Sequence, residues 1–269
     1  MRTLGLIGKA LTHSFSQQYF TKKFLQENID NAEYQLFTLA NIEEIKALLK
    51  LPSLCGFNVT IPYKSEIIPY LDELDTVAQE VGAVNCVIKQ HNKWIGYNTD
   101  VIGFEETLQE VESLRFKVQG LKFKENAEKN LTVLHSYGLT LSRSYALILG
   151  SGGAAKAVSY VLKQRNIPFK MVSRNKTAKT ITYNEVTEQL IHNSPLIINT
   201  TPLGMFPHID EMPQIPYSAL NHNHILIDLI YNPEETLFLK AGKERGAFTV
   251  NGLTMFKAQA EAGYDLMIR

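Results

Sequence analysis

Two polar segments of this chain could together move a proton. The first runs Asn58-Val59-Thr60-Ile61-Pro62-Tyr63-Lys64, and the second, Gly96-Tyr97-Asn98-Thr99-Asp100, ends in a carboxylate. A lysine that is partly shielded from water can donate and accept a proton near neutral pH. A carboxylate beside it would hold and orient its ammonium group. We therefore expect Lys64 and Asp100 to form a general acid/base pair.

Each of these two residues also has an ordinary structural interpretation. Lysine is mostly exposed in proteins, so Lys64 taken alone would belong to the surface. Asp100 stands just before apolar residues at helical spacing, and it could simply cap the helix that they predict. The proton-transfer hypothesis requires the two side chains to meet, whereas the structural interpretation does not.

A glycine-rich turn indicates a second kind of chemistry. The apolar run Ala146–Leu149 leads into Gly150-Ser151-Gly152-Gly153-Ala154, and apolar residues then recur at helical spacing. A strand, a glycine turn and a helix in this order let backbone N–H groups approach a pyrophosphate closely. We therefore predict that a dinucleotide binds at this turn.

The next predicted strand indicates which dinucleotide is bound. It ends Met171-Val172-Ser173-Arg174-Asn175-Lys176, without the Asp or Glu that would hold a ribose 2′-hydroxyl. A cation at this place favours a 2′-phosphate, so we expect NADP rather than NAD, with Ser173, Arg174 and Asn175 at the phosphate. The alternative is that Arg174 and Lys176 are solvated loop charges.

Two further polar turns offer groups that could bind a ligand. Asn199-Thr200-Thr201-Pro202-Leu203-Gly204-Met205 follows a predicted strand where the nicotinamide ribose of such a domain would lie, which makes Thr200 a candidate. Its alternative is a tight turn without function. His13-Ser14-Phe15-Ser16 precedes a helical pattern, and its hydroxyls could either cap that helix or bind a substrate carboxylate.

Strands and helices alternate along the chain in two series, which is typical of α/β domains. The first series predicts strands at residues 4–7, 34–39 and 55–59, helices at 16–25 and 42–49, and a hairpin of 84–88 with 94–97. The second series predicts strands at residues 146–149, 169–172, 196–199 and 225–229. Such a series with helices between its strands predicts a doubly wound sheet of parallel strands.

The length of the chain, 269 residues, exceeds what one core usually supports, so we expect two domains. Residues 1–102 would form an α/β substrate domain, and residues 103–252 a Rossmann-like NADP-binding domain. The helical pattern near the end would pack back on the first domain, so residues 253–269 would complete it. The Lys-rich stretch 113–142 lacks a sustained period, and we expect it on the outside of the cofactor domain.

Composition favours a small molecule as the partner. The 27 acidic and 27 basic residues balance, which leaves no global field for nucleic acid or an anionic membrane. Cys55 and Cys86 stand far apart, so neither a disulfide framework nor a metal site is predicted. No apolar run suits a signal peptide or a membrane span. We expect a cytoplasmic monomer or homodimer.

Taken together, these motifs resemble those of the shikimate dehydrogenase family, and the resemblance extends over nearly the whole chain. It rests on the Ser14/Ser16 and Lys64 segments, on Gly82-Ala83-Val84-Asn85 and on the glycine turn. The resemblance implies reversible reduction of 3-dehydroshikimate to shikimate with NADPH, in aromatic amino acid biosynthesis. It also implies that the substrate binds in a cleft between the two domains.

The same resemblance implies roles for single residues. Lys64 and Asp100 would be the catalytic pair, and Leu229 and Gly252 would meet the nicotinamide half of the cofactor. The implied substrate ligands are Ser14, Ser16, Thr60, Asn85, Tyr231 and Gln259. Three positions depart from residues usual in the family, namely Gln17, Ser173 and Thr254.

Two other functions stay open at this point. A quinate or dual quinate/shikimate dehydrogenase would use the same motifs on a substrate with one more hydroxyl. A non-catalytic dinucleotide-binding regulator would keep the fold without the chemistry, since a fold does not establish a function. Intact Lys64 and Asp100 speak against a regulator.

Overall fold

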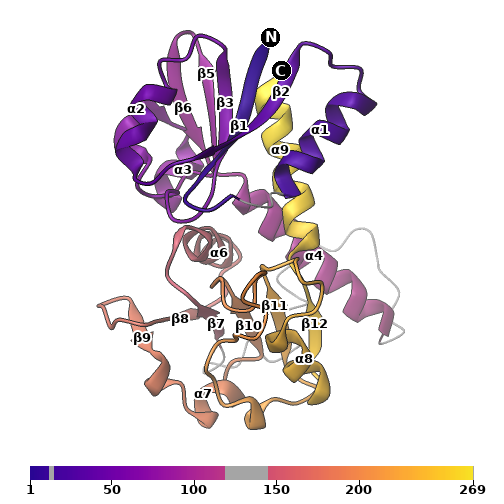
Figure 1. Cartoon of the computed structure of the whole chain (residues 1–269). Coiled ribbons are helices and arrows are strands. Elements are labelled where there is room, and N and C mark those ends of the chain that lie inside the picture. The colour runs from indigo at the N-terminus through magenta and orange to yellow at the C-terminus, as the bar shows by residue number, and fades with distance from the viewer. Residues whose placement is uncertain (12–14, 119–144, 269) are drawn as a thin grey trace. The chain divides into compact units, whose positions relative to one another are not determined.

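The chain folds into two compact units, which the computed structural model in Figure 1 describes at residues 1–11, 15–118 and 145–268, with the backbone alone at 115–118. The first unit comprises Met1–Asp100 and Ala258–Arg269, and the second comprises Val101–Lys257. The chain therefore leaves the first unit once and returns to it near the end. Each unit has its own sheet.

The first unit is built on a mixed six-stranded sheet in the order β2-β1-β3-β5-β6-β4. Neighbouring strands are parallel except at the β3/β5 and β5/β6 pairs. Its strands are β1 (Arg2–Gly8), β2 (Ala32–Thr38), β3 (Leu54–Val59), β4 (Glu73–Leu74), β5 (Cys86–Gln90) and β6 (Lys93–Tyr97). Its helices are α1 (Phe15–Gln26), α2 (Ile45–Leu48) and α3 (Thr76–Val81), with 3-10 turns at Ile42–Glu44 and Ile68–Tyr70.

Local sequence explains the hairpin that was predicted in this unit. Strands β5 and β6 pair antiparallel, and His91 and Asn92 between them adopt positive φ angles of 49° and 63°. Two left-handed residues form the tight turn whose twist matches the two strands that it joins. The hairpin prediction is confirmed. It brings Asn85, just before β5, opposite the end of β6, where Asn85 N donates to Tyr97 O at 3.0 Å.

The second unit is built on a parallel six-stranded sheet in the order β12-β11-β10-β7-β8-β9. Its strands are β7 (Ala146–Leu149), β8 (Phe169–Ser173), β9 (Thr180–Thr182), β10 (Leu196–Asn199), β11 (Ile225–Asp228) and β12 (Phe248–Val250). Its helices are α6 (Gly153–Gln164), α7 (Glu188–His192) and α8 (Leu237–Glu244), with 3-10 turns at Tyr183–Glu185 and Tyr217–Ala219; α4 (Asp100–Val118) and α9 (Leu253–Ile268) contribute to both units. The strand order reverses between β7 and β10, so the predicted doubly wound sheet is confirmed.

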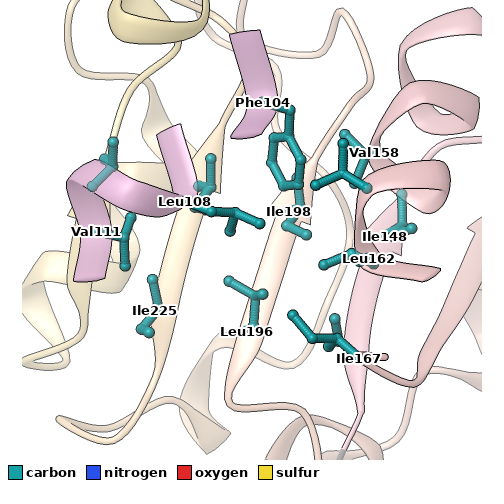
Figure 2. Close-up of a cluster of buried hydrophobic side chains, with 14 of the residues drawn as sticks. Phe104, Leu108, Val111, Ile148, Val158, Leu162, Ile167, Leu196, Ile198 and Ile225 are labelled. Carbon is teal, nitrogen blue, oxygen red and sulfur yellow. The ribbon is translucent and has the colours of Figure 1, made fainter. Parts of the chain in front are cut away.

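Side chains of this parallel sheet point alternately into two cores. Ile148 of β7 and Ile198 of β10 pack into the core that Figure 2 shows, together with Phe104 of α4 and Leu162 of α6. The intervening residues of the same strands, such as Ile197, join a second core. Helices therefore cover both faces, which is why the central strands β7, β10 and β11 are nearly continuous apolar runs rather than alternating ones.

Most of the Lys-rich stretch 113–142 lies outside the described residues, and its first residues continue α4. Over the described ranges no helix combines the length and the apolar character that crossing a membrane requires. In those same ranges no three His, Cys, Asp or Glu side chains gather as metal ligands. Cys55 and Cys86 are both free thiols.

Candidate active site

Lys64 and Asp100 meet in the first unit. The Nζ atom of Lys64 donates to Oδ2 of Asp100 across 2.6 Å. The lysine side chain is 16% exposed and the aspartate side chain is 6% exposed. Of the two side chains, the lysine is therefore the more accessible to solvent, and the carboxylate is the more buried.

Backbone bonds fix the turn that carries Lys64. Thr60, the first residue after β3, donates its N–H to Ile7 O at 2.9 Å, and Lys64 O accepts from Val84 N at 2.7 Å. Between them, Tyr63 is buried and donates its hydroxyl to Leu39 O at 2.7 Å. The turn is thus tied at both of its ends and in its middle, so the lysine stem starts from a fixed point.

The carboxylate of Asp100 is held on both of its oxygens. Oδ2 accepts from Lys64, and Oδ1 accepts from the side-chain amide of Asn85 at 2.9 Å. Asp100 is also the first residue of α4, where a negative charge is favoured by the helix dipole. The helix start and the contact with Lys64 are therefore compatible, and the two interpretations of this residue do not exclude each other.

Asn85 lies within the protein, with 2% of its surface exposed. Its Nδ2 atom is 2.9 Å from Asp100 Oδ1, 2.9 Å from Thr99 Oγ1 and 3.2 Å from Gln259 Oε1. An amide nitrogen carries two hydrogens, so three acceptors share them. Two residues that the family resemblance assigns to the substrate, Asn85 and Gln259, thus contact each other, and Asn85 also contacts the carboxylate of Asp100.

Thr99 and Asn58 belong to this network and are absent from the residues predicted from sequence. Thr99 N donates to Asn85 Oδ1 at 2.6 Å, and Thr99 Oγ1 donates to Gln259 O on α9 at 3.0 Å. Asn58 Oδ1 accepts from the hydroxyl of Tyr34 at 2.8 Å. The signal was available, because Asn58 is a polar residue near the end of the apolar strand β3 and Thr99 directly precedes Asp100.

The predicted hydroxyl ligands occupy different places in the first unit. Ser16 lies in the first turn of α1, and Thr60 follows β3; both are half-buried. A Cβ atom at Gly8 would lie 2.6 Å from Thr60 Cγ2, so glycine at the end of β1 lets Thr60 pack closely. Ser14, together with His13, lies outside the described residues.

The glycine turn of the second unit lies at the reversal of strand order. Gly150 has a φ of +120°, and a Cβ atom there would meet Thr200 Oγ1 at 2.4 Å. Thr200, directly after β10, donates this hydroxyl to Leu149 O at 2.7 Å. A Cβ at Gly152 would meet nothing within 4 Å, and among the described side chains none caps α6, which starts at Gly153. Ala154 follows within the first turn of the same helix.

Two cations that look alike in sequence, Arg174 and Lys176, differ in the structure at the end of β8. Lys176 Nζ lies 2.5 Å from Glu185 Oε1, and this hydrogen bond lowers the pKa of Glu185 to about 2. Arg174 and Asn175 are exposed on the same turn. Ser173, the last residue of β8, lies 3.1 Å from Ser151 of the glycine turn, Oγ to Oγ. The charge of Lys176 is therefore already met by a carboxylate.

The segment after β11 carries Leu229 and Tyr231. A Cβ atom at Gly252 would lie 2.1 Å from Leu229 O, so only glycine allows this approach. The Tyr231 ring lies 4.6 Å from the Phe256 ring, centroid to centroid, and burial raises the pKa of Tyr231 to about 12. Tyr231 belongs to the second unit, whereas the other predicted substrate ligands belong to the first.

One further polar residue is absent from the residues predicted from sequence. Asp228, the last residue of β11, is completely buried and accepts hydrogen bonds from Asn199, Ile230 and Thr236. Burial raises the pKa of its carboxyl to about 6. A charged residue type at the end of an apolar strand is the signal that could have found it.

Comparison with known proteins identifies the family. Residues 6–87 match the model described as "Shikimate dehydrogenase substrate binding domain". The Shikimate dehydrogenase (NADP(+)) of Methanococcus maripaludis is 34% identical over 281 residues, which cover 98% of this chain and 91% of the relative. The solved Shikimate Dehydrogenase 1 from Peptoclostridium difficile is 32% identical with a TM-score of 0.77, covering 99% of this chain and 91% of that one.

A second solved shikimate dehydrogenase, in complex with NADP+, is 30% identical with a TM-score of 0.71, covering 99% of this chain and 90% of that one. These similarities span both sheets and nearly the full length of each relative. They confirm the resemblance inferred from the motifs. The chain belongs to the shikimate dehydrogenase family.

Proposed function

We propose that this protein is a shikimate dehydrogenase, which reversibly reduces 3-dehydroshikimate to shikimate with NADPH in aromatic amino acid biosynthesis. The observation that carries the proposal is the 2.6 Å contact between Lys64 Nζ and Asp100 Oδ2 in a chain of this family. The Methanococcus relative is named as an NADP(+) enzyme, and one solved relative holds NADP+.

Reduction of the ketone requires a hydride at the carbonyl carbon and a proton at the carbonyl oxygen. NADPH, when bound, supplies the hydride. The Lys64 ammonium donates the proton to the oxygen as negative charge develops there, and in the reverse direction the neutral amine removes the hydroxyl proton. Asp100 orients the lysine through the short contact to Nζ.

The remaining polar residues of the first unit have two tasks in this proposal. Asn85 holds the carboxylate of Asp100, and Thr99 links Asn85 to Gln259 on α9. Substrate hydroxyls and the substrate carboxylate would be bound by Ser14, Ser16, Thr60, Asn85, Tyr231 and Gln259. Asn85 would thus serve both the Asp100 carboxylate and the substrate, and Gln259 would serve both Asn85 and the substrate, since each amide offers an oxygen and a nitrogen.

The residues of the second unit fit a dinucleotide phosphate. Open space at Gly152 leaves room for a pyrophosphate, and the uncapped start of α6 offers N–H groups and the positive end of a helix dipole. Gly150, Ser151, Gly153 and Ala154 would complete this turn. Arg174 would bind the 2′-phosphate with Ser173 and Asn175 beside it, and Thr200, Leu229 and Gly252 would meet the nicotinamide half.

In these assignments residues 1–102 with 253–269 would bind most of the substrate, and residues 103–252 would bind NADP and contribute Tyr231 to the substrate. We place the protein in the cytoplasm, where its two free thiols, Cys55 and Cys86, would stay reduced.

A spectrophotometric assay of the purified protein tests the proposal. Shikimate and quinate are each offered with NADP+ and with NAD+, and formation of the reduced cofactor is followed by absorbance. We expect the highest kcat/KM for shikimate with NADP+. A higher value for quinate would favour the quinate enzyme instead. Binding of NADP+ without oxidation of either compound would support a non-catalytic protein.

A further inference from the structure

A buried polar cluster lies at the carboxyl ends of β10 and β11, and the proposed proton transfer does not use it. Asn199 ends β10 and Asp228 ends β11, and the two are direct partners in the parallel register. Both residues have no exposed surface, and Thr236, which starts α8, is 1% exposed.

Asp228 joins three segments of chain. Its Oδ1 atom accepts from Asn199 Nδ2 at 3.0 Å and from Ile230 N at 3.1 Å, and its Oδ2 atom accepts from Thr236 Oγ1 at 2.6 Å. Asn199 Oδ1 in turn accepts from Thr201, at 3.0 Å from its N–H and 2.7 Å from its hydroxyl. The carboxylate thereby links the turn after β10, the segment after β11 and the start of α8.

These three donors are neutral, so a buried carboxylate here is energetically unfavourable. Desolvation raises the pKa of Asp228 to about 6, in spite of the hydrogen bonds that oppose the shift. A neutral side chain of the same size would avoid this cost, but an amide has only one acceptor oxygen, and its nitrogen would face a donor. The carboxylate is suited to holding all three donors at once.

The backbone that Asp228 holds is also fixed from other sides. Leu229 N donates to Asn199 O at 3.0 Å, and Ile230 O accepts from Gly252 N at 2.9 Å. In an open α/β sheet the ligand binds outside the carboxyl ends of the strands, beside the reversal of strand order. The reversal in this sheet lies between β7 and β10, so both turns linked by Asp228 stand at that edge.

We propose that Asp228 is a positioning residue for the nicotinamide half of the cofactor. It acts through Asn199 on the Thr200–Thr201 turn and through Ile230 on the segment from Leu229 to Tyr231. This inference rests on the proposed function, because NADP(H) is the ligand that these turns would orient. The adenosine half, at Arg174 and the far side of the glycine turn, lies outside the reach of the cluster's hydrogen bonds.

The test compares two ligands on one variant. Asp228→Asn keeps the shape of the side chain and removes one acceptor, and calorimetry gives Kd for NADP+ and for 2′,5′-ADP, which lacks the nicotinamide half. We expect Kd for NADP+ to rise roughly tenfold, the scale of one disrupted buried hydrogen bond, and Kd for 2′,5′-ADP to change less than about twofold. Bound NADPH should also show altered nicotinamide fluorescence.

Two further changes separate positioning from general stability. Thr236→Val removes the hydroxyl that Asp228 accepts from and should weaken NADP+ in the same way, while Thr236→Ser restores the hydroxyl and should rescue binding. His224, at the opposite end of β11, is 2% exposed and its ring lies 3.1 Å from Ile191 O. His224→Gln is the matched control, expected to lower the melting temperature and leave both Kd values unchanged.

Equal weakening of both ligands by Asp228→Asn, or NADP+ affinity unchanged in both Asp228→Asn and Thr236→Val, would overturn the positioning role. Wild-type protein that binds neither ligand would overturn it together with the cofactor assignment. If the wild type binds both ligands, the variants lose NADP+ selectively and shikimate is not oxidised, the inference stands and the proposed function fails.

Discussion

The two units each contain a buried aspartate that is held in nearly the same way. In the first unit, Asn85 donates its amide to Asp100 Oδ1 at 2.9 Å and accepts from Thr99 N at 2.6 Å with its oxygen. In the second, Asn199 donates its amide to Asp228 Oδ1 at 3.0 Å and accepts from Thr201 N at 3.0 Å with its oxygen. The asparagine in each case links a carboxylate to a threonine turn.

The two carboxylates differ in the partner of their second oxygen. Asp100 Oδ2 accepts from the ammonium of Lys64, whereas Asp228 Oδ2 accepts from the hydroxyl of Thr236, each at 2.6 Å. The lysine side chain keeps 16% of its surface exposed, while Thr236 keeps 1%. Burial therefore does not distinguish a carboxylate proposed to orient the proton donor from one proposed to position a backbone turn. The charge and the accessibility of the partner do.

The largest effect is expected when the pair of Lys64 and Asp100 is broken. Lys64→Ala should lower kcat for shikimate oxidation by about 100-fold or more with little change in KM, because general acid/base contributions span about 10² to 10⁴. Lys93→Ala is the control, since Lys93 also pairs with a carboxylate, Glu73 at 2.5 Å, but its side chain is 58% exposed. A near-normal kcat in Lys64→Ala would remove the lysine from the mechanism.

The second prediction concerns the pH at which the Asp228 carboxyl becomes charged. Its pKa is raised from 3.8 to about 6 on folding, so its contribution to stability is fully present below about pH 4 and is lost as pH rises through 6. A shift of roughly two units corresponds to about 3 kcal/mol. Denaturant titrations measure the free energy of unfolding of the wild type and of Asp228→Asn. The value for the wild type minus that for the variant should be larger by about that amount at pH ~4 than at pH ~7. A difference that stays constant with pH would contradict the raised pKa.

The third prediction compares two cations on one turn, Arg174 and Lys176. Arg174→Ala should raise KM for NADPH about tenfold more than KM for NADH, since hydrogen bonds to charged groups contribute about 1.5 to 3 kcal/mol. Lys176→Ala should change the ratio of the two KM values far less, because Glu185 already meets its charge at 2.5 Å. Equal effects of Arg174→Ala on both cofactors would mean that this arginine does not bind the 2′-phosphate.

The last prediction concerns a hydroxyl in the first unit. Ser16→Ala should weaken substrate binding by about 1 to 3 kcal/mol if its hydroxyl binds the substrate carboxylate. Substrate KM and melting temperature are both measured, because a purely structural serine would change the melting temperature and leave substrate KM alone.

Much of the fold follows from local sequence. Apolar runs bounded by glycine or polar turns predict the strands, and their alternation with helical patterns predicts the doubly wound sheet, because these features depend on residues close together in the chain. The antiparallel placing of β5 beside β3 does not follow from such signals. This placing depends on packing between strands that are far apart in the sequence.

The site shows the same division between local and distant information. The residue types at Lys64 and Asp100 are enough to predict an acid/base pair, because that chemistry needs them. Sequence does not show that the amide of Asn85 is shared among three acceptors, or that Lys176 pairs with Glu185 nine residues later. These contacts arise from strand ends brought together by folding.

The return of the chain to its first unit has a consequence for its synthesis. Tyr264 and Met267 pack with Leu4 and Phe20 in one core, so the first unit lacks part of its interior until α9 has been made. The second unit, Val101–Lys257, is continuous and is translated completely before those residues emerge. On the ribosome, therefore, the part of the protein that is made first is the last to acquire all of its core. Loss of the residues beyond Ala258 should damage the first unit and spare the second.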